Sequence, residues 1–117
     1  MESKSIDLTF LKEMSENDSN FIADLIQSFI TQIPKDMENM WFHFKNEEYD
    51  DVANLIHKIK PSITFMGIHE LKDMVVEIED NAKKRQIDPI EDQLKLFDKI
   101  CRKAIAELLD ELPLYKK

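Results

Sequence analysis

Apolar residues recur at helical spacing along most of the chain. Between residues 21 and 33 one returns every fourth position with others beside it, giving a wide stripe of Phe21, Ile22, Leu25, Ile26, Phe29, Ile30 and Ile33. A later series has the 4-3-4-3 spacing of a core-facing helix and contains Val52, Ile56, Ile59, Ile63 and Met66. The pattern predicts four long helices, at about residues 21–44, 49–66, 69–82 and 88–108.

Residues that begin and end helices separate these stripes. A short helix is predicted at residues 9–14, capped by Asp7 and followed by the polar break at residues 15–19. Pro34 should kink the first long helix or restart it, and Gly67 stands where a helix C-cap is expected. We therefore expect an all-α fold, an antiparallel four-helix bundle with a short extra N-terminal helix, forming one domain over residues 1–117.

Composition narrows the possible functions. The single glycine among 117 residues cannot build a glycine-rich nucleotide loop. The net charge of −8 disfavours nucleic-acid binding, which needs a surplus of Lys and Arg. With no membrane-spanning stretch, no signal peptide and one cysteine, a soluble cytoplasmic protein is expected. The acidic surplus lies in residues 1–52, whereas residues 53–86 carry 6 basic and 5 acidic residues and offer local positive charge.

His57 is the strongest candidate for chemistry. At about 100° per residue it points roughly 130° away from the core seam of its helix, so it is expected to be exposed. Its side of the helix holds three small residues and one basic residue, which would leave a shallow cleared patch around the imidazole: Ala53, Thr64, Gly67 and Lys60. An exposed imidazole is mostly neutral and nucleophilic at pH 7, and Lys58 and Lys60 would attract a phosphoryl group. A solvent-facing histidine without a role is the alternative.

Pro61 follows His57 by four residues, inside the same predicted helix. Its missing N–H leaves the carbonyl of His57 without its usual partner, at a cost of about 3 kcal/mol relative to alanine. The proline could serve to bend the helix at the site, or it could be a kink that the fold merely tolerates.

The other candidate residues are weaker. His43 is expected to be packed or peripheral, His69 to cap a helix or lie on the surface, and Cys101 to be a small core residue. Since no two histidines are four residues apart and no Glu-x-x-His is present, no metal site is expected.

Residues 53–62, followed by 66–68, resemble the signature of histidine-containing phosphotransfer (HPt) domains. That signature is a histidine, then an apolar residue two positions later, a lysine three later, a small residue four later and a glycine ten later, here His57, Ile59, Lys60, Pro61 and Gly67. The resemblance extends to the bundle as a whole and to Glu79 on the following helix. Pro61 departs from it, because the family most often has glycine there.

The resemblance implies a phosphorelay intermediate. His57 would accept a phosphoryl group on Nε2 from the phospho-aspartate of one receiver domain and pass it to the aspartate of another. The implied partners are the receivers of a hybrid histidine kinase and of a response regulator, and Mg²⁺ would be held by the receiver, with no cofactor on this chain. No ATP-dependent kinase activity is implied, and a monomer is expected.

Supporting residues follow from the same reading. Lys58, Lys60 and residues 83–85 would complement an acidic receiver, while Ala53, Pro61, Thr64 and Gly67 would keep the approach to His57 clear. Residues 40–44, or those around Ile68, would supply apolar docking surface. Two other functions stay open, a helical adaptor that binds a signalling partner without phosphotransfer and a metal-binding bundle.

Overall fold

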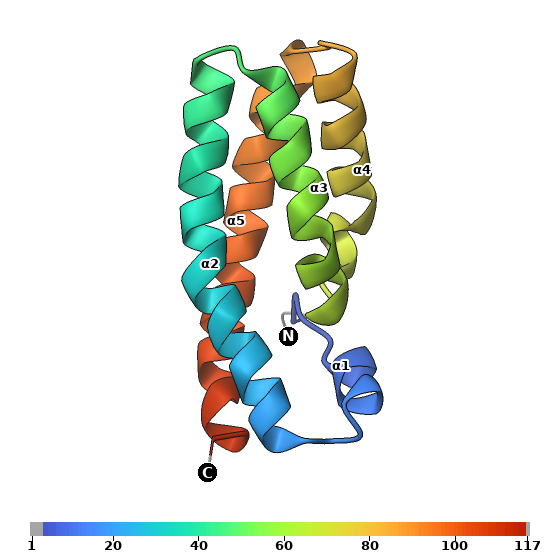
Figure 1. Ribbon diagram of the computed structural model, residues 1–117, viewed down its shortest axis with the longest axis vertical. Helices are drawn as coiled ribbons and strands as arrows, with labels where there is room; N and C mark the ends of the chain where they lie inside the picture. Colours follow the sequence, from blue (N-terminus) through green and yellow to red (C-terminus); the bar gives the residue numbers. More distant parts are fainter. Residues whose placement is uncertain (1–3, 117) are drawn as a thin grey trace.

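The computed structural model describes residues 4–116, and its helices follow the predicted ones closely. They are α1 (Thr9–Met14), α2 (Ser19–Lys45), α3 (Tyr49–Phe65), α4 (His69–Lys83) and α5 (Asp88–Glu111), followed by the short 3-10 helix η1 (Leu112–Leu114). Helices α2 to α5 lie side by side and alternate in direction, and α1 lies near the end of the bundle where α3 passes into α4 (Figure 1). The predicted antiparallel four-helix bundle with an extra N-terminal helix is confirmed.

The hydrophobic core is one continuous cluster to which all five α-helices contribute. Every member of the predicted seam of α3 is buried, with at most 3% of its surface exposed. Cys101 is buried in the same core on α5, and burial raises the pKa of its thiol to about 12. The prediction of a small core cysteine is therefore confirmed. No helix of residues 4–116 is long and apolar enough to cross a membrane.

Helix α2 is continuous through Pro34 over its 27 residues. Figure 1 shows that its N-terminal part leans away from the line of its C-terminal part, so the kink that Pro34 predicts is present and the restart is not. The polar break before α2 also behaves as expected, because Asp18 is the N-cap and accepts a hydrogen bond from the amide of Phe21 at 3.2 Å.

The N-terminal segment is tied to the ends of three helices. The amide of Ser5 donates to Glu107 of α5 at 2.7 Å, and the amide of Asp7 donates to the carbonyl of Met66 at 3.0 Å. The Asp7 carboxylate accepts from the amide of Thr9 at 3.0 Å and lies 3.2 Å from Nε2 of His69. These contacts, led by that of Thr9, lower the pKa of Asp7 to about 2. His69 is thus a surface residue that pairs with this segment.

Gly67 makes the close approach of this segment possible. It follows the C-cap residue of α3 in the left-handed conformation, with φ at 62°, as its predicted capping position requires. A Cβ atom built on Gly67 would overlap the carbonyl oxygen of Asp7. Gly67 is therefore covered by the N-terminal segment.

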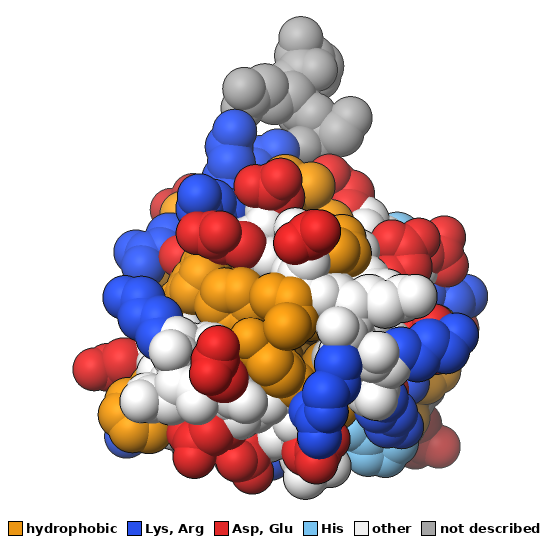
Figure 2. All heavy atoms as spheres, turned by 90° about the horizontal axis from the view of Figure 1, so that it is seen from above, with side chains coloured by type: hydrophobic (Ala, Val, Ile, Leu, Met, Phe, Trp, Pro, Cys, Tyr) orange, Lys and Arg blue, Asp and Glu red, His pale blue; other side chains and the backbone are white. Residues whose placement is uncertain are grey.

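Seen end-on, the molecule carries acidic and basic side chains interleaved around its circumference, with apolar side chains grouped near the middle of that end (Figure 2). One ion pair links helices there, since Arg85 after α4 lies 3.4 Å from Asp50 in the first turn of α3. The uneven charge of the sequence is thus partly balanced between helices in the folded chain.

Candidate functional site

His57 lies in the middle of α3 and its side chain is 71% exposed, as the helical pattern predicts. One ring nitrogen faces a neighbour: Nδ1 lies 3.3 Å from Oε2 of Glu79 on α4. Because Nδ1 faces α4, Nε2 on the other side of the ring is left for an incoming group. The site therefore consists of an exposed imidazole with a carboxylate behind it.

Glu79 is a buried carboxylate held by two lysines. Its side chain is 9% exposed, and its oxygens lie 2.8 Å from Nζ of Lys60 and 2.9 Å from Nζ of Lys83. The hydrogen bonds from Lys60 and then Lys83 lower the pKa of Glu79 to about 2, outweighing the opposite effect of burial. Glu79 is therefore fully charged at neutral pH.

This ion-pair network leaves the site with a surplus positive charge. Two ammonium groups face one carboxylate beside the imidazole, so the sum of Lys60, Lys83 and Glu79 is +1. The resemblance to HPt domains includes Glu79, but the sequence did not indicate that Lys60 and Lys83 would pair with it. The position of Glu79 could have indicated such partners. It stands four residues after Val75 and three before Ala82, on the apolar face of α4, and a carboxylate that is buried there needs a partner.

The rest of the predicted basic patch is more dispersed. Lys58 is 66% exposed and lies 3.8 Å from Oδ1 of Asp36 on α2, on the other side of α3 from Glu79. Of residues 83–85, only Lys83 reaches the site. Lys84 pairs with Asp80 at 3.0 Å, and Arg85 turns to the start of α3.

Two of the residues predicted to clear the imidazole do not do so. Ala53 is 2% exposed, because α4 packs along this side of α3, as the pairing of Lys60 with Glu79 shows. Gly67 lies ten residues from His57, about 15 Å along the helix, beneath Asp7. Of the small residues, Pro61 and Thr64 are exposed, and the hydroxyl of Thr64 donates to the carbonyl of Lys60 at 3.3 Å.

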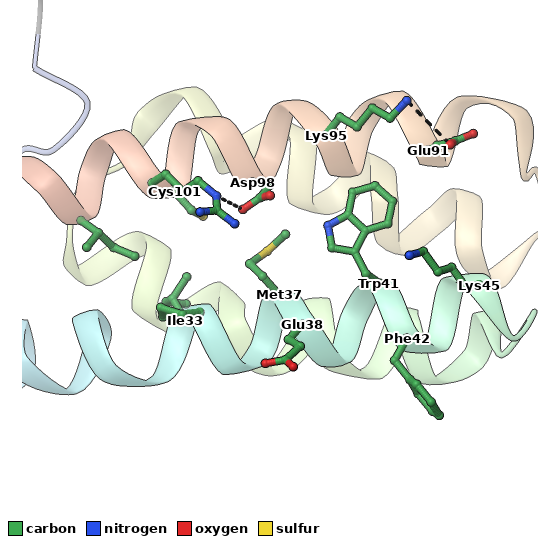
Figure 3. Close-up of a pocket in the computed structure, with 13 residues that line it drawn as sticks. Ile33, Met37, Glu38, Trp41, Phe42, Lys45, Glu91, Lys95, Asp98 and Cys101 are labelled. Atoms are coloured by element: carbon green, nitrogen blue, oxygen red, sulfur yellow. Dashed lines mark hydrogen bonds and ion pairs between the residues drawn. The ribbon is translucent and has the colours of Figure 1, made fainter.

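The predicted apolar docking residues also need correction. Met40 and Ile68 are fully buried, because both fall on core-facing positions. Phe42 is 59% exposed and points away from α5, whereas Trp41 points into a groove of about 1030 Å³ between α2 and α5 (Figure 3). Apolar side chains from Ile33, Met37 and Cys101 line this groove, away from His57.

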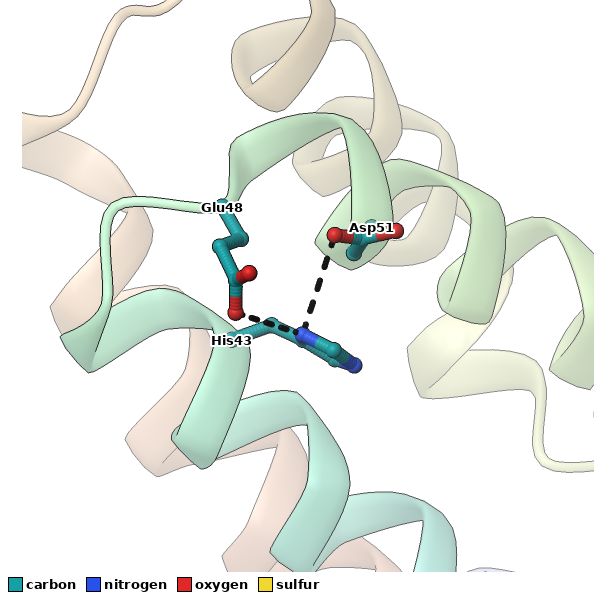
Figure 4. A group of neighbouring side chains, drawn as sticks. All are labelled: His43, Glu48 and Asp51. Carbon is teal, nitrogen blue, oxygen red and sulfur yellow. Dashed lines mark hydrogen bonds and ion pairs between the residues drawn. The ribbon is translucent and has the colours of Figure 1, made fainter.

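One group of side chains among residues 4–116 has the ligand types of a metal site. At the turn between α2 and α3, Nδ1 of His43 lies 3.0 Å from Oε1 of Glu48 and 3.8 Å from Oδ2 of Asp51 (Figure 4). An imidazole and two carboxylates can bind a divalent cation, and the same atoms can equally form a surface ion pair. Spacing rules missed the group because its members lie across a turn, and His43 is half-buried there. The absence of a bound metal stays a prediction.

Comparison with protein families gives one match. The model of the Hpt domain matches residues 24–113, a range that contains His57, Lys60, Glu79 and Lys83. Comparisons with curated proteins and with solved structures give no significant match.

Proposed function

The chain belongs to the Hpt domain family, whose members serve histidine phosphotransfer in two-component phosphorelays, and we propose that His57 carries the phosphoryl group here. The observation that carries this proposal is the free Nε2 of an exposed mid-helix imidazole whose Nδ1 faces a charged carboxylate. The other two histidines differ. His43 is only 29% exposed, and His69 turns Nε2 toward Asp7.

Glu79 favours the reactive tautomer of His57. A carboxylate beside Nδ1 stabilises a proton on that nitrogen, which leaves the lone pair on Nε2. Nε2 then attacks the phosphorus of a phospho-aspartate, an N–P bond forms, the bond from phosphorus to the aspartate oxygen breaks, and the aspartate leaves as a carboxylate. The phosphorylated ring keeps its Nδ1 proton and is cationic, so Glu79 stabilises it as well. Reversal of these steps delivers the group to a second aspartate.

The lysines support the reaction electrostatically. Lys60 and Lys83 hold Glu79, and their surplus charge, with that of exposed Lys58, attracts a phosphoryl group and the acidic receiver site around it. In this proposal Mg²⁺ belongs to the receiver, and the donor and acceptor are the receivers of a hybrid histidine kinase and of a response regulator. Like other Hpt domains, this chain would be a phosphocarrier and not a kinase.

An apolar surface next to His57 gives a receiver a place to dock. Exposed Pro61 lies one turn further along α3 and Phe65 two turns, and Phe65 stacks on the half-exposed ring of Phe10 with centroids 6.0 Å apart. Phe65 and Leu25 also line a shallow hollow of about 150 Å³ between α2 and α3. This surface replaces residues 40–44 and Ile68 as the proposed docking face.

Transfer from a phosphorylated receiver domain tests the proposal. Wild-type protein should acquire an acid-labile, base-stable label, which His57→Gln should abolish. His43→Gln and His69→Gln are matched controls that should keep it. Absence of label, or label unchanged in His57→Gln, contradicts the proposal, and receiver binding without any label supports the adaptor function.

A further inference from the structure

The outward face of α2 carries an apolar centre flanked by two charges. Phe42 is 59% exposed, and neighbouring Trp41 lines the groove toward α5 (Figure 3). Glu38 and Lys45 occupy helix positions before and after this pair that are about 20° apart around the axis, since seven residues make almost two turns. Within residues 4–116 the side chains of Glu38 and Lys45 have no ion pair or hydrogen bond, although charged neighbours across the groove do.

The two charges are placed symmetrically about the apolar centre. Each lies about 5 Å along the helix axis from the midpoint between Trp41 and Phe42, with opposite sign. A second α2 laid antiparallel across this midpoint therefore puts Glu38 of each copy opposite Lys45 of the other. The two Trp41 positions then face each other near the centre, as do the two Phe42 positions. A parallel arrangement in register would oppose like charges and is disfavoured.

We propose that the chain forms a two-fold symmetric homodimer through this face of α2. The two copies would be joined by the aromatic centre and by two Glu38–Lys45 ion pairs, in place of the monomer that the sequence suggested. With 27 residues, α2 is about 40 Å long, and the helix face and the groove beside it would together supply the roughly 800 Å² per partner that a stable interface needs.

The charged side chains of α5 that line the groove are already ion-paired with one another, so they do not oppose this contact. Lys95 lies 3.7 Å from Glu91, and Arg102 lies 2.9 Å from Asp98, both within α5. The unpaired charges at the groove, Glu38 and Lys45, are thus those that a second copy would complement. This self-complementarity favours a second copy over a partner of one net charge.

The proposed interface is separate from the phosphotransfer site. His57 contacts Glu79 of α4, on the side of α3 away from the outward face of α2. Both imidazoles of a dimer therefore stay accessible. The homodimer does not rest on the proposed phosphotransfer, and either one can fail without the other.

The mass of the full chain in solution tests the homodimer. Sedimentation equilibrium from about 10 µM to about 1 mM should show the mass rise from 13.8 kDa toward twice that value. A mass that stays at 13.8 kDa throughout overturns the proposal. Phe42→Ser should weaken dimerisation by about tenfold or more, whereas Val76→Ser, at a similarly exposed site on α4, should not.

Charge reversal tests the arrangement of the two copies. Glu38→Lys and Lys45→Glu should each weaken the dimer by about tenfold, because each places like charges opposite one another twice. The double variant Glu38→Lys/Lys45→Glu should restore wild-type affinity. Helix content and melting temperature check that each variant is folded. A dimer that is insensitive to both single changes, or is not restored in the double variant, lies on another face and overturns the proposal.

Discussion

Replacing Gly67 with alanine tests the structural role of the chain's single glycine. The structure predicts that Gly67→Ala destabilises the bundle strongly but leaves the chemistry of His57 intact. The sequence pattern placed Gly67 at a helix C-cap, but it also suggested that this glycine clears space for a partner at His57, a role that predicts the reverse. The two interpretations differ because a Cβ at Gly67 meets Asp7 and not the imidazole.

The size of the effect follows from two contributions. A non-glycine residue in the left-handed conformation costs about 1–2 kcal/mol. The Cβ also pushes away the backbone of Asp7, whose amide donates to Met66, and losing that hydrogen bond costs about 0.5–1.5 kcal/mol. The sum is about 1.5–3.5 kcal/mol, which lowers the urea midpoint by roughly 1–2 M.

A matched control separates conformation from contact. Glu47, at the end of α2, has φ of 59°, close to that of Gly67, but it is exposed. Glu47→Gly should therefore stabilise the protein by up to about 1 kcal/mol. Urea unfolding measures the free energy of unfolding of both variants. Receiver-dependent labelling of the Gly67→Ala protein that remains folded shows whether His57 still accepts a phosphoryl group. A loss below about 1 kcal/mol, or full stability with abolished labelling, would refute the role assigned to Gly67.

Three further experiments test the site and the core. The ion pairs of Glu79 stabilise the fold fully above its ordinary pKa of 4.5, and this contribution is lost as the pH falls toward about 2. Glu79→Gln should therefore flatten the acid-unfolding profile in that range, and an unchanged profile contradicts the role of the pairs. Lys60→Ala should slow transfer to His57 by about tenfold while the bundle stays folded, since Lys83 still holds Glu79; circular dichroism that shows unfolding would make Lys60 structural. The buried Cys101 thiol, with its pKa raised to about 12, should be alkylated only in denaturant. Mass spectrometry measures the alkylation, and rapid alkylation of the native protein contradicts the burial of Cys101.

The helices were predictable because their signals are local. The spacing of Val52, Ile56 and Ile59 depends only on the 3.6-residue period, and each of these residues is buried as expected. The position of Gly67 after α3 is likewise a local capping preference. The reason that glycine is needed there is not local. Asn17, Glu47 and Arg85 adopt the same conformation after other helices without being glycine.

The surroundings that the sequence predicted for His57 differ from the structure where they depend on neighbouring helices. A helical wheel places Ala53 near His57 in angle but does not show that α4 covers that side of α3. It also gives Lys58 and Lys60 the same role, although Lys60 turns to α4 and Lys58 toward α2. The exposure of His57 was predictable because it depends only on the angle from the core seam.

The lysines resolve a conflict that Glu79 would otherwise create. In the proposed reaction, a carboxylate beside Nδ1 selects the reactive tautomer and stabilises the phosphorylated ring, but its negative charge would repel the phosphoryl group that Nε2 attacks. Lys60 and Lys83 make the net charge beside the imidazole positive, and they also hold the carboxylate in place. An acidic chain with a net charge of −8 can thus present a positive site to an acidic partner. The proposed reaction therefore accounts for a buried Glu79 that is held by two lysines instead of one.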